Sequence, residues 1–398
     1  MLFRSAVNFI MPFIMMLGPI GFMFGAGGSA LIAKTLGEGD RARANRLFTL
    51  FVYVTVGLSV VLSALGILFI RPIAAALGAE GAMLDDCVVY GRIIIATMPF
   101  LMLQFEFQSF FVTAEKPQLG LWVSVAAGVA NIILDALLTA IIPLGLVGAA
   151  WATSISQVVG GVIPLFYFSR ENDSLLRFTK TSFDGRALLR ACANGSSELM
   201  SNISMSVVNM LYNVQLIAYA GEDGVAAYGV LMYVNLIFLS AFIGYSTGVA
   251  PVVGYHFGAR NTDELKNLRR RSLKLIGIFS VAMLFLSLAL AHPLSSVFVG
   301  YDEALLSLTV RGFMIYSFSF LFAGIAIFGS AFFTALNNGF ISAMIAFLRT
   351  LLFQVAAVLF FPLLWGIDGI WISIVAAEVM AATVTVFFLL IKQKKYRY

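Results

Sequence analysis

The chain contains an internal repeat, and this repeat constrains its fold more than any other feature. The hydrophobic segments, glycines and prolines of residues 27–148 recur without a gap 221 residues later. The helix breakers and loop boundaries of the two segments all keep this same offset, which indicates two homologous lobes. The matched pairs include Gly27 with Gly248, Pro72 with Pro293, Gly91 with Gly312, Phe107 with Phe328, and Gly148 with Gly369.

The composition places the chain in a membrane. Hydrophobic residues make up 61% of the 398 residues, charged residues make up 11%, and the mean hydropathy is +0.96. A single soluble core cannot hide so much apolar surface. We therefore predict an all-α membrane protein whose two pseudo-symmetric helical bundles contain eleven transmembrane helices. The apolar spans lie at 7–33, 48–70, 88–113, 119–142, 146–168, 195–219, 226–256, 273–297, 306–334, 339–364 and 367–391.

The repeat also predicts the domain boundaries. An N-terminal lobe of five helices covers residues 1–169, and a linker follows at 170–194. A C-terminal lobe of six helices covers residues 195–391, and a tail ends the chain at 392–398. The helix at 195–219 that opens the second lobe has no counterpart 221 residues earlier. We therefore expect the first lobe to lack its first helix, so that eleven of twelve helices are present.

The basic residues predict the topology. Twenty of the 25 Lys and Arg residues lie in alternate connections, at 34–46, 116, 170–190, 260–274 and 392–397. Basic loops stay preferentially in the cytoplasm, so the linker and the C-terminus are predicted to be cytoplasmic. The formal net charge of +5 fits this topology and a contact with membrane lipids. No interleaving of aromatic and basic residues suggests a nucleic-acid partner.

The sequence gives no indication of an enzyme. It contains no HExxH, GxSxG or Walker motif. Cys87 and Cys192 are predicted on opposite sides of the membrane, so they cannot form a disulfide or a shared metal site. We expect no cofactor, and no metal beyond a coupling ion.

Polar residues inside apolar spans are costly and mark functional positions. In the span 119–142, Asn131 and Asp135 share one small, polar helix face with Ser124, Gly128 and Thr139. The short connection 143–145 makes the next helix an antiparallel neighbour, and that helix carries Thr153, Ser156 and Gln157. The oxygens of Asp135, Asn131 and Thr153 suit a sodium ion or, if burial favours the neutral acid, a proton. Alternatively, Asn131 and Thr153 only cross-link the two helices.

Further polar side chains, including Gln157, are candidates for a substrate cavity. Gln104 and Gln108 share a face of the span 88–113, whereas Glu106 points roughly opposite, so these three do not form one site. Glu106 is either a substrate or proton carboxylate or the partner of a neighbouring helix. In the second lobe, Arg349 and Glu378 (at the repeat position of Gln157) are predicted to form a buried, structural ion pair.

Several of these segments resemble the multidrug and toxic compound extrusion (MATE) transporters. The resemblance rests on residues 25–37, 131–135 and 148–153, and residues 105–117 and 195–198 resemble the bacterial MepA/DinF-like branch. It implies two six-helix bundles in a bacterial inner (plasma) membrane that rock between inward-open and outward-open states and expel cationic, lipophilic drugs by Na⁺ or H⁺ antiport. It also assigns the ion site to Asn131, Asp135 and Thr153.

Two other functions stay open at this point. A lipid-linked oligosaccharide flippase of the same superfamily would need several basic residues at cavity depth, and only Arg349 fits. A transport-inactive membrane fragment is the other alternative, because we expect the first lobe to lack a helix. We expect a monomer whose partners are small cationic drugs and membrane lipids.

Overall fold

The computed structural model describes residues 16–398, and every regular element in this part of the chain is a helix. The chain forms two compact units, of which the first ends at Gly195 and the second comprises Ser196–Tyr398. The part of the predicted span 7–33 that precedes residue 16 lies outside the described residues. The all-helical class predicted from the sequence is confirmed.

The first unit is built from helices joined by short connections. Asp40 caps α3 by accepting a hydrogen bond from the Arg43 amide, and Pro19 and Pro117 lie in the first turns of α2 and α6, where proline is tolerated. The elements are α2 (Pro19–Gly37), α3 (Arg41–Ala76), α4 (Gly81–Ala96), α5 (Met98–Thr113), α6 (Pro117–Asp135), the π-helical turn η1 (Ala136–Ile141) and α7 (Gly145–Ser169).

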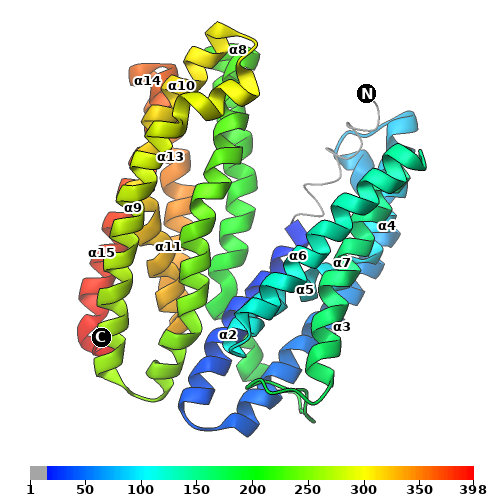
Figure 1. The fold of residues 1–398 in the computed structure, drawn as a ribbon, viewed down its shortest axis with the longest axis vertical. Helices are drawn as coiled ribbons and strands as arrows, with labels where there is room; N and C mark the ends of the chain where they lie inside the picture. The colour runs from blue at the N-terminus through cyan, green and yellow to red at the C-terminus, as the bar shows by residue number, and fades with distance from the viewer. Residues whose placement is uncertain (1–15) are drawn as a thin grey trace. The chain divides into compact units, whose positions relative to one another are not determined.

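Helix α8 (Gly185–Gly258) begins in the first unit and supplies the first two spans of the second unit. It consists of two arms, because Gly221 adopts φ +62° and ψ −149°, a conformation that interrupts a helix. The arms pack on each other through the stacked rings of Tyr212 and Tyr228, 5.4 Å apart, and Figure 1 shows them as separate helices. The arms correspond to the predicted spans 195–219 and 226–256, but α8 starts at Gly185, within the stretch predicted as linker.

The remaining helices of the second unit follow the predicted spans. They are α9 (Thr262–Val299), α10 (Glu303–Ser317), α11 (Phe320–Ala335), α12 (Gly339–Phe347), the π-helical turn η2 (Leu348–Leu352), α13 (Phe353–Phe360), α14 (Pro362–Trp365) and α15 (Ile367–Tyr396). In residues 16–398, eight helices are long and apolar enough to cross a membrane, or ten if each of two bent pairs forms one span. Counting the two arms of α8 separately gives the eleven spans that the sequence predicts.

Two predicted spans are bent. The span 88–113 consists of α4 and α5, which meet at 48°, and the span 306–334 consists of α10 and α11, which meet at 51°. The breaks at Thr97 and Phe318 are 221 residues apart, so they repeat in the register of the sequence. Pro99 accounts for the first break, because its ring has no N–H donor and clashes with the carbonyl group four residues earlier, but no proline accompanies the second.

Large apolar side chains cover the outside of these helices. Trp122 and Ile132 on α6 are 66% and 70% exposed, and Phe285 on α9 is 66% exposed. Such a surface is unfavourable in water and suits a hydrocarbon environment. Inside the first unit, small residues allow close packing: a Cβ on Gly21 would lie 2.3 Å from the Met102 carbonyl oxygen of α5.

Candidate functional site

The α6–α7 hairpin carries the predicted ion-binding residues. Gly145 starts α7 with φ +57°, which reverses the chain after η1. Gly148 then packs against η1, because a Cβ at this position would lie 2.4 Å from the Leu138 carbonyl oxygen. As predicted from the short connection, α6 and α7 are neighbours in close contact. Asn131 and Asp135 therefore lie on the helix next to the one that carries Thr153.

The three side chains are half-buried. Asp135 is the last residue of α6, and its carbonyl oxygen accepts a 2.5 Å hydrogen bond from Thr139 in η1. Among residues 16–398, no hydrogen bond or ion pair engages the side chains of Asn131, Asp135 or Thr153. Their ligand set, one carboxylate with neutral oxygens, is suited to a monovalent cation or a proton.

The described part of the chain contains no cluster of side chains that is typical of a divalent metal site. Groups of three or more His, Cys, Asp or Glu side chains are absent from residues 16–398. A site for a divalent ion normally requires more negative ligands than Asp135 provides alone.

The kink between α4 and α5 contains a polar cluster that the sequence analysis missed. Thr97 Oγ1 lies 2.8 Å from Gln157 Oε1 and 3.1 Å from Ser154 Oγ, both on α7. Ser154 in turn donates to the carbonyl oxygen of Ile93, 3.2 Å away. These contacts satisfy backbone carbonyl groups near the break. Gln157, predicted as a cavity residue, thus accepts a hydrogen bond from Thr97 at the kink. The sequence signal that could have indicated Thr97 was Pro99, two residues later.

Glu106 is a buried carboxyl group without a hydrogen-bond partner among residues 16–398. Its side chain is fully buried on α5. Neither of its carboxyl oxygens has a partner in the described chain, and the same is true of Thr55 Oγ1 and Ser63 Oγ on α3. A buried carboxyl group without partners is unfavourable, which favours a functional role over a purely structural one.

The two glutamines near Glu106 do not join it. The side chain of Gln104 packs against Gly160 of α7, where an added Cβ would lie 2.5 Å from the amide oxygen, and Gln108 is exposed. Glu106 is buried whereas Gln108 is exposed, so these two residues lie on different faces of α5.

Arg349 and Glu378 form the predicted ion pair in the second unit. The Nε atom of Arg349, in η2, lies 2.9 and 3.1 Å from the two carboxylate oxygens of Glu378 on α15. The side chains are only 16% and 8% exposed. Nearby, the Tyr212 hydroxyl donates to Gln354 Oε1 at 2.7 Å and lies 2.9 Å from Ser373 Oγ. The partners that these groups have within the unit favour a structural role for the pair.

Comparisons with known proteins agree with this architecture. A family model described as MatE matches residues 5–137 and 199–360. The "Multidrug export protein MepA" of Staphylococcus haemolyticus (strain JCSC1435) is 26% identical over 391 residues, which cover 96% of this chain and 84% of the relative. The protein of the same name from Staphylococcus aureus (strain MRSA252) is 25% identical over 380 residues, covering 95% of this chain and 83% of the relative.

Solved structures share the fold. The chain matches a structure described as the outward-facing conformation of a multidrug resistance MATE family transporter of the MOP superfamily, with a TM-score of 0.93 and 21% identity. The match covers 99% of this chain and 88% of the other. A MATE crystal structure in the bent conformation matches with a TM-score of 0.91 and 21% identity, covering 100% and 88%.

Proposed function

The chain belongs to the MatE family, and on that premise we propose that it exports cationic, lipophilic compounds across a bacterial inner membrane. Support comes from relatives named as multidrug export proteins, which match nearly the whole chain. We further propose that export is coupled to antiport of Na⁺ or H⁺ through rocking of the two lobes. The protein is proposed to act as a monomer with its C-terminus in the cytoplasm, in agreement with the basic loops.

The observation that carries the coupling proposal is the carboxylate of Asp135. It lies toward the end of a membrane helix without an ion-pair partner in residues 16–398, and an ionised side chain inside a membrane span is costly, by about 2.5–3.5 kcal/mol at the helix centre on insertion scales. A bound Na⁺ or H⁺ would remove this cost. Asn131 and Thr153 would supply neutral oxygens to the ion from the same hairpin.

Glu106 provides a second carboxyl group that could distinguish the two ions. Because it is fully buried without hydrogen-bond partners in the described residues, its neutral form is the one that this environment tolerates. We propose that Glu106 carries a proton. If H⁺ is the coupling ion, Glu106→Gln should abolish efflux; if Na⁺ is, the variant should retain it.

The test measures ethidium efflux from proteoliposomes under an imposed Na⁺ or H⁺ gradient. We expect Asp135→Asn to abolish gradient-driven efflux with little change in the yield of folded protein, because the substitution removes charge but keeps shape. Asp223→Asn, at an exposed acid near Gly221, is the matched control and should leave efflux unchanged. Retained efflux in Asp135→Asn would refute the ion site, and wild-type protein without efflux under either gradient would refute the export proposal.

The flippase alternative gains no support from the basic residues. Arg349, the one candidate that fitted it, is already neutralised by Glu378. A site for an anionic lipid-linked sugar would need cationic side chains that are free to bind it.

A further inference from the structure

The segment 170–184, called the strap below, is fixed along α3. Asn45 Oδ1 accepts a 2.9 Å hydrogen bond from the backbone amide of Arg177, and Thr49 Oγ1 accepts a 3.0 Å hydrogen bond from the amide of Thr179. Arg41 adds a hydrogen bond of 3.0 Å to the carbonyl oxygen of Ser174. Side chains of α3 thus satisfy the extended backbone of the strap, which has no secondary structure of its own.

Apolar and ionic contacts hold the strap as well. Leu176 is fully buried, and the ring of Phe178 stacks on that of Phe48 at 5.1 Å. At its start, Lys116 forms a 2.8 Å ion pair with Asp173. This hydrogen bond raises the pKa of Lys116 and lowers the pKa of Asp173. The strap therefore holds the first turn of α8 in a defined place on the first unit.

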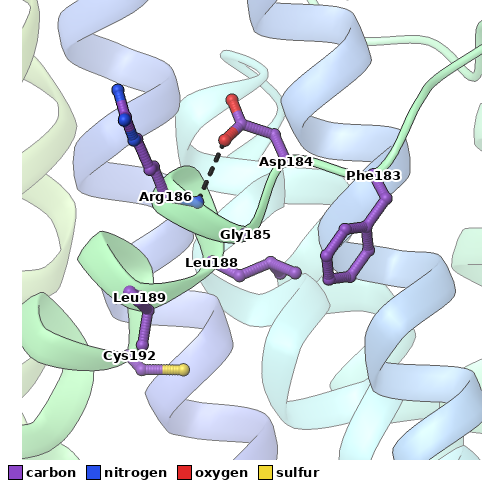
Figure 2. Close-up of a pocket in the computed structure, with 7 residues that line it drawn as sticks. All are labelled: Phe183, Asp184, Gly185, Arg186, Leu188, Leu189 and Cys192. Atoms are coloured by element: carbon purple, nitrogen blue, oxygen red, sulfur yellow. Dashed lines mark hydrogen bonds between the residues drawn. The ribbon is translucent and has the colours of Figure 1, made fainter.

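An apolar groove follows where the strap enters α8. It has a volume of about 640 Å³ and is lined by Phe183, Asp184, Gly185, Arg186, Leu188, Leu189 and Cys192. Figure 2 shows the Leu188 side chain pointing toward the ring of Phe183, while Arg186 points away from that ring. The side chains of Phe183 and Leu189 are 80% and 73% exposed. Nothing in the described chain covers these two side chains.

The charges around the groove are predominantly positive. Lys180, Arg186 and Arg190 are exposed and form no ion pair in the described residues. The nearest acid, Asp184, accepts hydrogen bonds of 3.1 and 3.0 Å from the amides of Arg186 and Ala187 and so caps α8. Asp173 is paired with Lys116, so neither acid neutralises the basic side chains directly.

The position of the groove on α8 indicates what covers it. Residues 183–192 directly precede the apolar span 195–219 of the same helix, so the groove lies where α8 leaves the hydrocarbon. Exposed aromatic and aliphatic side chains next to Lys and Arg at this level are typical of segments that lie in the lipid interface. The charge of the groove is complementary to acidic headgroups, and each basic residue near an anionic surface contributes about a fivefold preference.

We propose that residues 183–192 bind an anionic phospholipid of the leaflet that faces the strap. The acyl chain covers Phe183 and Leu189, and the phosphate group is held by the positive charge of Lys180, Arg186 and Arg190. Bound lipid then anchors the start of α8, and hence the junction between the first unit and the second, at the membrane surface.

The experiment uses the full chain in lipid nanodiscs with a bimane label at Ser182→Cys, in a background where Cys87 and Cys192 are replaced by Ser. Ser182 is exposed beside the groove, so the label reports on lipid without filling the site. Brominated phosphatidylglycerol and brominated phosphatidylcholine are compared as quenchers. We expect phosphatidylglycerol to quench at a mole fraction at least about tenfold lower, with the difference shrinking as NaCl rises.

Charge-removing variants separate a site from a general surface effect. Replacing Lys180, Arg186 and Arg190 with Gln should abolish the preference for phosphatidylglycerol, because these exposed side chains supply the charge. Replacing three basic residues of α9, Arg270, Arg271 and Lys274, with Gln removes the same charge elsewhere and should leave the preference unchanged. These α9 side chains are also exposed, so both variants are expected to fold.

Three outcomes would overturn the proposal. They are equal quenching by the two lipids in the protein that keeps Lys180, Arg186 and Arg190, an undiminished preference in the groove variant, and an equal loss of preference in the α9 control. Soluble glycerol phosphate at millimolar concentration should not reverse the quenching, since the proposed ligand is a lipid. The readout is independent of drug efflux, so it does not depend on the proposed function.

Discussion

The Arg349–Glu378 pair allows a quantitative prediction for the second unit. Glu378→Gln keeps the shape of the side chain and its ability to accept a hydrogen bond, but it leaves the charge of Arg349 uncompensated. Both side chains are largely buried, and the two Nε–O distances of 2.9 and 3.1 Å describe a fully formed pair. Breaking a buried pair from one side costs about 3–5 kcal/mol. Because Arg349 retains 16% exposure, we expect the lower end, about 3 kcal/mol.

The matched variant removes both charges. Arg349→Met combined with Glu378→Leu replaces the pair with apolar side chains of similar volume, a change that is often neutral or stabilising in buried sites. We expect its free energy of unfolding to lie within about 1 kcal/mol of wild type or above it. Since the pair is assigned a structural role, this double variant should also keep drug efflux.

Unfolding in mixed micelles with increasing SDS, followed by circular dichroism, measures these differences. The reasoning would be refuted if Glu378→Gln were as stable as wild type, because the pair would then contribute nothing. A stable double variant that has lost efflux would instead show that the two charges act in transport.

Two further predictions concern the first unit. Gly27→Ala should destabilise it by about 1–3 kcal/mol, because the new Cβ would lie 1.9 Å from the Ala191 carbonyl oxygen. Gly57→Ala is the control, because a Cβ at Gly57 would have no atom within 4 Å. Equal unfolding midpoints for the two variants would contradict the prediction. The ion pair Lys116–Asp173 should hold the strap at pH values between 3.8 and 10.5, the ordinary pKa values of the two groups. It should release the strap as the pH falls through the lowered pKa of Asp173 or rises through the raised pKa of Lys116. Hydrogen exchange of residues 172–179, corrected for intrinsic rates, should therefore accelerate at acidic pH in wild type. In Asp173→Asn it should already be accelerated at neutral pH. Equal protection of these amides in wild type and Asp173→Asn at neutral pH would disprove the assignment.

The sequence alone determined which segments are helical and how they repeat. Apolar length and the positions of Gly and Pro are local properties, so they predicted the spans, the two lobes and the tight α6–α7 hairpin. The resemblance in residues 25–37, 131–135 and 148–153 identified the family that the comparison with known proteins then confirmed. Charge complementarity in the second lobe was enough to predict that Arg349 and Glu378 would meet.

The tertiary structure decided which polar groups find partners. Helical spacing assigned Gln157 to a cavity, but the 48° bend between α4 and α5 brings Thr97 to it. The strap was predicted as part of a linker, yet its backbone amides donate hydrogen bonds to the side chains of Asn45 and Thr49 on α3, which are 132 and 130 residues away in the sequence. Glu106 gave no sign in the sequence of whether a partner existed. Such pairings depend on the rotation and bending of helices that are distant in the chain, and a local pattern of residues does not encode these variables.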